Sequence, residues 1–534
     1  MFLNLLLLLI VLYGLSSVVR YLVRSKTFRT FETQNHCAPA KTIPNKFPYG
    51  WGHKIHLLRP KGDFLDDVLA LKYATFGSTH ALHTPLTNQI KVISTIDPEN
   101  IQAILSTRFK DYGRVRSRVK ALDPLLGEGI FTSDGQAWSH ARTLLRPEFT
   151  LRRLKDIRSL ETHVGYLFQA IGETDQDGWI KEVELLELFF DLTLDSISEF
   201  LFGTSIGSHI TTLQGKHAIG NGDTSNSTQS FSEALNYAND CIGRRFRLGS
   251  LYWLWDTLPF RQACSRVHNI VDKFIADISN DHFSGRLDIN DESNLEKGPN
   301  DGSGLLHSLI SQTRSSLELR NQALHILTAG RDTTAVLLAW VFVMLTRHPD
   351  DLSRLRQEII SHFGSESEPK NEINFRSLKA CTYLQWVIIE TLRLYPAGPF
   401  NGRMVLRDTV LPVGGGPDGQ QPVAVPKGAI VNYSSYLVQR RKDLWGDDAN
   451  EWKPERWEGR KVGWEFTAFS GGPRVCLGQQ YALTETAFVV VRMLQHYPKI
   501  QSVESSSTIR KGYATILCPA DGIRVKLFKP KGDS

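Results

Sequence analysis

The chain has 534 residues, of which 41% are hydrophobic and 22% are charged, and its formal net charge at pH 7 is +6. This is the composition of an ordinary globular protein, long enough for one large domain or two smaller ones. The excess of positive charge is small, and the sequence contains no basic run with interleaved aromatic residues. We therefore do not expect the protein to bind nucleic acid.

The first 19 residues, MFLNLLLLLIVLYGLSSVV, are nearly all apolar, and basic residues follow at Arg20, Arg24, Lys26 and Arg29. An apolar run of about 18 residues is just long enough to span a bilayer. A cleaved signal peptide is the alternative, but it would carry positive charge before the apolar run. Positive charge after the run keeps that flank in the cytosol. We predict a single-pass membrane anchor over residues 1–22 and a cytosolic body.

Cysteine usage agrees with a cytosolic body. The six cysteines show neither a CxxC pair nor the spacing of zinc ligands, and reduced thiols are expected at Cys37, Cys241, Cys264, Cys381, Cys476 and Cys518. Two glycosylation sequons occur, at Asn226 and Asn432. Neither is expected to carry a glycan if the body faces the cytosol.

Behind the anchor, residues 23–63 are predicted to form a stiff linker, because prolines recur at positions 39, 44, 48 and 60. No second linker is evident, so residues 64–534 are predicted to form one large domain. Two polar stretches within it, 203–230 and 280–304, are expected to be loops.

Helical periodicity dominates this domain. Residues 316–348 contain no proline, are apolar on most faces and stop before Pro349, which predicts one long buried helix. A second helix is expected over residues 377–395, ended by Pro396. The alternating pattern of residues 423–436 favours small strands. The predicted fold class is mainly α with a minor β part.

A glycine-rich loop, FSGGPRVCLGQQ at residues 469–480, places Cys476 directly before a helical pattern over residues 482–497. A thiolate at this position gains from the partial positive charge of the helix N-terminus. Arg474 would direct a fixed cation at an anionic ligand, and the glycines would allow backbone to approach a planar one. The alternative is a glycine-rich turn with an inert cysteine.

This loop resembles the haem-binding loop of the cytochrome P-450 superfamily, whose pattern FxxGxRxCxG is filled by Phe469, Gly472, Arg474, Cys476 and Gly478. The resemblance implies that the Cys476 thiolate is the proximal ligand of haem iron, the metal of this site. It further implies that Phe469 shields the sulfur and that Arg474 pairs with a haem propionate.

Three further motifs resemble the same superfamily. In AGRDTT (329–334), the resemblance implies that Thr333 and Asp332 are catalytic and deliver protons during O2 activation, with Gly330 making room for O2. A polar kink in a buried helix is the alternative. In WSHAR, Trp138 and Arg142 are implied to reach a haem propionate, as is Arg403 of NGR.

The third motif is ETLR, in which Glu390 and Arg393 share a helix face, together with the later PERW that contains Arg456. A surface ion pair is the commoner meaning of such spacing. The resemblance instead implies a buried Glu390–Arg393–Arg456 triad. We classify this triad as structural rather than catalytic, because a buried charge network requires full pairing.

The runs at 126–149, 329–335, 411–423 and 469–495 resemble fungal alkane and fatty-acid hydroxylases. The resemblance implies a haem monooxygenase of the endoplasmic reticulum membrane that uses O2 and electrons from NADPH, delivered by NADPH-cytochrome P-450 reductase. Its lipophilic substrate would be a long-chain alkane or fatty acid, or a polyketide or lipid-like intermediate of fungal secondary metabolism. Basic residues at 152, 153, 155 and 440–442 either dock the reductase or are ordinary solvated charges.

Two other classes of function remain open: a haem-binding or sensor protein without oxidative turnover, and an enzyme that rearranges hydroperoxides without a reductase. Both are disfavoured by the acid–alcohol pair Asp332–Thr333, for which a passive haem binder has no use.

Overall fold

The computed structural model describes residues 16, 19, 22–44, 63–83, 90–149, 157–210, 224–283, 304–504, 506 and 508–530, with side chains of 224–230 and 281–283 left aside. These residues are mainly helical with a minor strand content, as predicted. The chain forms two compact units. The strand-rich unit comprises Met1–Val115, Phe400–Val438 and Gly463–Arg474; the helical unit comprises Arg116–Pro399, Gln439–Val462 and Val475–Ser534.

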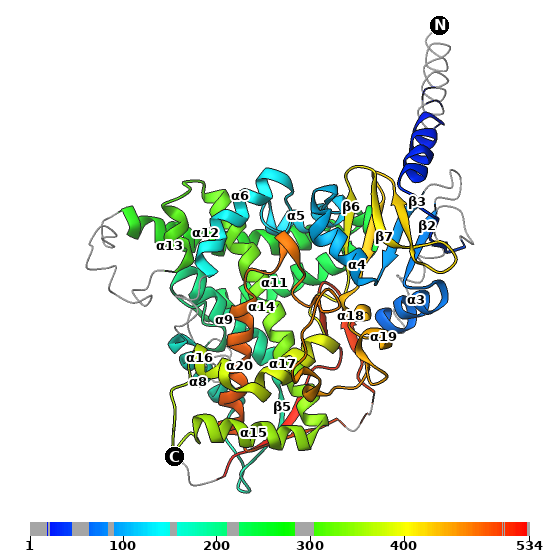
Figure 1. Ribbon diagram of the computed structural model, residues 1–534. Coiled ribbons are helices and arrows are strands. Elements are labelled where there is room, and N and C mark those ends of the chain that lie inside the picture. Colours follow the sequence, from blue (N-terminus) through cyan, green and yellow to red (C-terminus); the bar gives the residue numbers. More distant parts are fainter. Residues whose placement is uncertain are drawn as a thin grey trace. The chain divides into compact units, whose positions relative to one another are not determined.

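The strand-rich unit is built on a six-stranded sheet of order β1-β2-β3-β9-β6-β4, several strands of which are labelled in Figure 1. A separate pair, β7–β8, is antiparallel. Strands β8 and β9 confirm the strands expected within residues 423–436. The elements are β1 (Lys41–Thr42), β2 (Thr79–His83), β3 (Ile90–Thr95), β4 (Tyr112–Gly113), β6 (Asn401–Val405), β7 (Thr409–Gly415), β8 (Gln421–Val425) and β9 (Ile430–Tyr433), with helices α3 (Leu71–Phe76), α4 (Pro98–Gln102) and α18 (Ser435–Val438). Short π-helical segments occupy Phe64–Ala70 and Ala103–Thr107, and 3-10 turns occupy Phe109–Asp111 and Gly472–Arg474.

The predicted linker differs from the structure where the structure describes it. Residues 22–34 are helical rather than extended, and Arg24 donates a hydrogen bond to the carbonyl of Lys427 at 2.8 Å. Strand β1 pairs with β2, and Ala40 and Ile43 beside it are buried. Residues 40–43 therefore belong to the folded unit, because Ala40 and Ile43 are buried there and β1 is paired. Residues 45–62 lie outside the described part.

The helical unit holds the long helices and two small sheets, β10-β13-β5 and β11-β12 (Figure 1). Its helices are α5 (Arg116–Leu126), α6 (Gly135–Leu145), α8 (Arg158–Ile171), α9 (Leu185–Phe202), α11 (Thr224–Leu248), α12 (Leu258–Phe283), α13 (Leu305–Ile310), α14 (Ser316–Arg347), α15 (Pro349–Phe363), α16 (Phe375–Ala380), α17 (Thr382–Leu394), α19 (Lys442–Trp445) and α20 (Gln479–His496). Its strands are β5 (Trp179–Glu184), β10 (Lys499–Ser502), β11 (Lys511–Tyr513), β12 (Leu517–Pro519) and β13 (Arg524–Phe528).

Helix α14 confirms the long buried helix predicted from the sequence. It begins after Ser315, whose hydroxyl accepts the Glu318 N–H, and ends directly before Pro349, where helical backbone is disfavoured. By length and hydropathy α14 would suffice to cross a membrane, but 78% of its apolar window is buried inside the protein. Because it packs against α9, α17 and α20, it is the core helix of this unit.

Three boundaries differ from the sequence expectation. The helix expected over 377–395 is broken at Cys381, whose extended backbone separates α16 from α17. Part of each expected polar loop is helical, because residues 224–230 belong to α11 and 280–283 to α12. Residues 211–223 and 284–303 of those loops lie outside the described part.

Candidate functional site

Cys476 lies at the N-terminal end of α20, two positions before its N-cap Gly478. Its side chain is exposed, while Cys241, Cys264 and Cys381 are buried. The surrounding protein raises the pKa of the Cys476 thiol, an effect opposed by the backbone N–H of Gly478 and by the cation of Arg142. The sulfur is thus accessible, and it has a donor and a positive charge beside it that favour a thiolate.

Arg142 and Trp138 come to this position on α6. The guanidinium carbon of Arg142 lies 5.9 Å from the centre of the Trp138 ring, and its Nη1 donates to the carbonyl of Val475 at 3.1 Å. Desolvation lowers the pKa of Arg142, and a neighbouring Arg146 adds to the effect. The structure therefore brings together the predicted pair Trp138 and Arg142 with Cys476, across more than three hundred residues of sequence.

Phe469, Gly472 and Arg474 of the loop motif belong to the strand-rich unit. Arg474 lies 5.7 Å from the centre of the Phe109 ring, and Phe469 is half-buried. Gly472 has φ +61°, and a Cβ there would lie 1.9 Å from the carbonyl oxygen of Leu105. The sequence interpretation assigned Gly472 to close approach of a planar ligand. The structure supplies a different reason for a glycine, because the backbone itself already occupies the space of a side chain.

Arg403 lies on β6 and is almost fully buried within the strand-rich unit. Its Nη1 donates to the Asn401 side-chain oxygen and to the Gly402 carbonyl, each at 3.1 Å, and its guanidinium lies 5.8 Å from the Tyr433 ring. These contacts hold the side chain beside its own strand.

The acid–alcohol pair lies on α14, where each side chain has its own partner. Thr333 donates to the carbonyl of Ala329 at 2.6 Å, which is the local backbone bond considered as the alternative. Asp332 is buried, and its carboxylate accepts from Arg331 and from Asn239 of α11, each at 2.9 Å. Burial raises the pKa of Asp332, although Arg331 opposes the shift.

Gly330 packs against α9 rather than leaving α14 open. A Cβ at Gly330 would lie 2.6 Å from the side chain of Ile197, so the glycine allows the two helices to approach. Beside it, the hydroxyl of Thr193 on α9 donates to the Arg331 carbonyl at 2.9 Å. Helix α14 stays continuous through this position.

Glu390, Arg393 and Arg456 form the predicted triad. Glu390 and Arg393 are fully buried and pair through two hydrogen bonds of 2.8 Å, and Arg456 reaches Glu390 at 3.3 Å. The Trp457 indole and the Lys453 backbone N–H also donate to the Glu390 carboxylate. The remaining donors of Arg393 go to backbone carbonyls of Gln439, Ala449 and Glu451. Each charge therefore has the partners that burial demands.

The basic residues considered for partner docking are only partly described. Arg440 donates to the Leu394 carbonyl, and Arg441 forms an ion pair with Asp443 at 2.6 Å. These two cations are engaged locally, so they offer less free charge than the sequence suggests. Arg152, Arg153 and Lys155 lie outside the described residues.

Sequence reasoning missed a buried polar cluster between α9 and α20. The hydroxyls of Ser196 and Tyr481 are 2.7 Å apart, and the fully buried Glu485 lies beside them. Burial raises the pKa of Glu485 to about 8. The sequence does show an acidic residue, Glu485, inside the apolar run ALTETAFVVV. It does not show that Ser196 on α9 lies beside this residue.

Comparison with known proteins identifies the family. The family model for cytochrome P450 matches residues 76–527. The chain is 42% identical over 435 residues to cytochrome P450 monooxygenase g430 of a Fusarium species, covering 81% of this chain and 75% of the relative. It is 40% identical over 443 residues to cytochrome P450 52A13 of Debaryomyces hansenii, covering 82% of each. Cytochrome P450 monooxygenase alt2 of Alternaria solani is 38% identical over 482 residues, covering 88% of this chain and 87% of the relative.

The chain therefore belongs to the cytochrome P450 family, and both compact units are parts of one P450 domain. It is a haem-thiolate monooxygenase whose electrons come from NADPH through a reductase, and O2 and a substrate are its other reaction partners. The two alternatives left open by the sequence, a passive haem binder and a hydroperoxide-rearranging enzyme, do not fit this family assignment to monooxygenases.

The triad predicts a specific loss of stability. Glu390→Gln should lower the free energy of unfolding by about 3–5 kcal/mol, because Arg393 would remain buried without a counter-charge. Denaturant unfolding of the purified protein measures the change. Glu182→Gln is the matched control, since Glu182 pairs with Arg524 at 3.1 Å with both side chains about half exposed. The control should lower the free energy of unfolding by less than about 1 kcal/mol. Equal losses in both variants would contradict the structural role of Glu390.

The two loop glycines predict opposite outcomes. Gly472→Ala should abolish or severely reduce folded protein, because its Cβ would meet the Leu105 carbonyl and its φ is positive. Gly478→Ala should fold normally, because its φ is −85° and the nearest atom to a Cβ, on Phe149, is 3.7 Å away. Soluble yield and the thermal unfolding midpoint measure both. A folded Gly472→Ala variant of ordinary stability would show that the local backbone differs from this description.

Proposed function

We propose that Cys476 supplies the thiolate that holds the haem, and that this enzyme hydroxylates a lipophilic substrate. The observation that carries the assignment is the setting of Cys476, an accessible sulfur with a backbone N–H and a guanidinium beside it. Cys241, Cys264 and Cys381 are buried, so their sulfur atoms are less accessible to a planar cofactor than that of Cys476. A coordinated metal ion displaces the thiol proton, so the raised pKa of Cys476 does not prevent ligation.

The charges of the proposed cofactor-binding residues suit a haem. Haem carries two anionic propionates, and Arg142, Arg474 and Arg403 are the cations that we propose to pair with them, with Trp138 beside Arg142. Phe469, Gly472 and Gly478 complete the proposed cofactor-binding residues. Gly478 is the position where a side chain has space in the structure, so contact with a planar ligand is the reason we propose for a glycine there.

We propose that Thr333 and Asp332 manage protons during turnover. A haem held by Cys476 would supply the O2 activation that monooxygenation needs, with electrons from the reductase. The Thr333 hydroxyl donates to Ala329, which fixes its orientation and leaves its oxygen as an acceptor. Desolvation raises the pKa of the buried Asp332 carboxyl group, a direction that favours its protonated form.

The substrate proposed is a long-chain alkane or fatty acid, or a polyketide or lipid-like intermediate of fungal secondary metabolism. Support comes from the resemblance of the cysteine-loop and acid–alcohol segments to fungal alkane and fatty-acid hydroxylases. The relatives named above, all fungal or yeast P450 proteins, agree with that range. A screen by haem spectral shift from fatty acids to polyketides separates the two chemistries.

We propose that residues 1–22 anchor the enzyme in the endoplasmic reticulum membrane, with the catalytic domain behind them in the cytosol and a microsomal NADPH-cytochrome P-450 reductase as electron donor. Val19, Leu22 and Val23, at the start of the described N-terminal helix, are more than half exposed and continue the apolar sequence. In the helical unit, Trp253 and Leu258 are also strongly exposed. Apolar side chains left open to solvent are expected where lipid covers them.

The ligand assignment predicts the spectrum of the reduced carbon monoxide complex. Cys476→His should abolish the red-shifted band of a thiolate-bound haem and replace it with that of an imidazole-bound haem, because the donor changes from an anionic sulfur to a neutral nitrogen. Cys37→Ala, which removes a cysteine of the strand-rich unit, is the control and should leave the band unchanged. A wild-type band in Cys476→His would refute the assignment while leaving the family membership intact.

The proton role predicts a change in coupling rather than in folding. Thr333→Val should lower product formed per NADPH by at least tenfold and raise hydrogen peroxide release, because the hydroxyl that orders protons is lost. Thr333→Ser keeps the hydroxyl and should retain most of the coupling. The measurement is product and peroxide per NADPH in reconstituted enzyme. Equal coupling in both variants and the wild type would show that Thr333 serves only its helix.

A further inference from the structure

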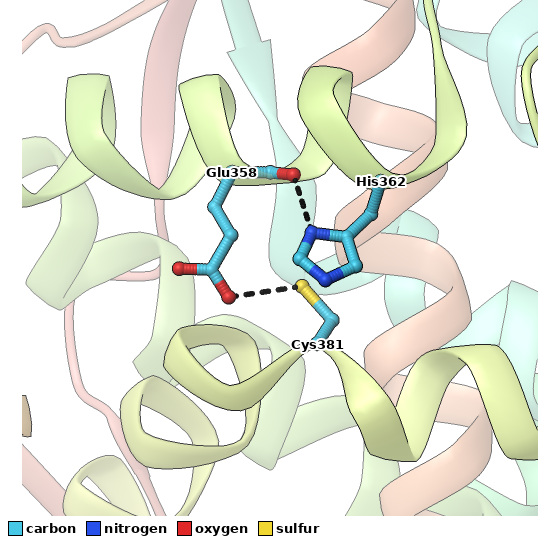
Figure 2. Close-up of side chains that lie close together, drawn as sticks. All are labelled: Glu358, His362 and Cys381. Carbon is cyan, nitrogen blue, oxygen red and sulfur yellow. Dashed lines mark hydrogen bonds between the residues drawn. The ribbon is translucent and has the colours of Figure 1, made fainter.

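A second group of potential metal ligands lies between α15 and the start of α17 within the helical unit (Figure 2). It consists of Glu358 and His362 on α15 and Cys381 at the N-cap of α17. One ligand atom from each residue lies within 4.8 Å of the others. None of the three belongs to the haem site proposed above.

The imidazole is oriented as a metal ligand requires. His362 Nδ1 lies 3.0 Å from the backbone carbonyl of Glu358, so Nδ1 carries the proton and Nε2 keeps its lone pair. A second hydrogen bond of this kind fixes the tautomer and direction of most metal-binding histidines. Figure 2 shows the ring, the thiol and the carboxylate turned toward one another.

The carboxylate and thiol already face each other. The Cys381 sulfur is fully buried and lies 3.5 Å from Glu358 Oε1, which also accepts the Tyr383 N–H at 3.0 Å. These two hydrogen bonds cap the first turn of α17, and capping by itself explains why Glu358 and Cys381 lie together. That account leaves out His362, whose Nε2 forms no hydrogen bond among the described residues.

We propose that Glu358, His362 and Cys381 form a zinc site that ties α15 to the N-terminus of α17. Thiolate, imidazole and carboxylate together are a ligand set typical of Zn2+, and water would complete the tetrahedron. Bond lengths of about 2.0–2.3 Å place tetrahedral ligands roughly 3.5 Å apart, so closure needs a shift of about 1 Å. Side-chain rotation of Glu358 and His362 supplies this shift, because neither is fully buried.

Binding would act on the helix that carries the buried charge triad. Helix α17 begins at Thr382 and bears Glu390 and Arg393 farther along. Since Zn2+ would bind only the folded arrangement of α15 and α17, it would stabilise the fold. The thiolate, not the thiol, is the ligand, so binding would also release the Cys381 proton and strengthen as the pH rises.

The test uses full-length holoenzyme in detergent, treated with a chelator and then titrated with Zn2+. Equilibrium dialysis with elemental analysis should give one tightly bound zinc per protein. Cys381→Ser and His362→Gln should each weaken this binding at least tenfold. His140→Gln is the matched control, because His140 faces the carboxylate of Glu318 at 2.8 Å and this pair belongs to no three-ligand group among the described residues.

X-ray absorption at the zinc edge supplies a readout independent of activity and of haem iron. The expected first shell contains one sulfur, which disappears in Cys381→Ser while the thiolate-haem spectrum confirms that this variant is folded. Zinc should raise the thermal unfolding midpoint of the wild type and not that of His362→Gln. Binding without sulfur, or with equal affinity in the wild type and both variants, means adventitious zinc only and overturns the proposal.

Discussion

The fully buried pair of Glu390 and Arg393 is the constraint on which the rest of the helical unit depends. Two opposite charges without solvent are unfavourable unless every donor and acceptor is satisfied. Here the side chains of Arg456 and Trp457 donate further hydrogen bonds to the Glu390 carboxylate. Backbone carbonyls between residues 439 and 451 accept the remaining hydrogen bonds of the Arg393 guanidinium. Residues 439–457, which contain only short helices, are therefore held against α17 by these hydrogen bonds.

Helix α14 combines packing contacts with the two side chains proposed to manage protons. Its glycine lets α9 approach, and its Arg331 and Asp332 are held by Asn236 and Asn239 on α11. The Thr333 hydroxyl donates to the backbone carbonyl of Ala329 in the same helix. A proton role for Asp332 thus requires exchange of a hydrogen bond that the structure shows with Asn239. The buried network holds the side chains of Arg331 and Asp332 in the arrangement that the structure shows.

The family motifs were readable in the sequence because each consists of residues close together on one helix or loop. The motif of Cys476, the ETLR pair and the WSHAR pair all follow that rule. That these motifs lie close together in space was inferred from the resemblance. The structure adds the contacts of Arg142 with Val475 and of Arg456 with Glu390. Gly472 was also identified, but for a different reason, because the Leu105 carbonyl that excludes a side chain is remote in sequence.

By itself the sequence determined the long buried helix and the strands near 423–436, since periodicity and proline positions are properties of neighbouring residues. The partners of the triad and the role of the cysteine loop were implied by the resemblance of their motifs to a known family. Only the tertiary structure decided that α16 and α17 are separate, that β1 joins the sheet and that Glu485 is buried against α9. The same holds for Cys381, which meets Glu358 and His362 across two helices. Such contacts arise from packing between distant segments, and local patterns carry no record of them.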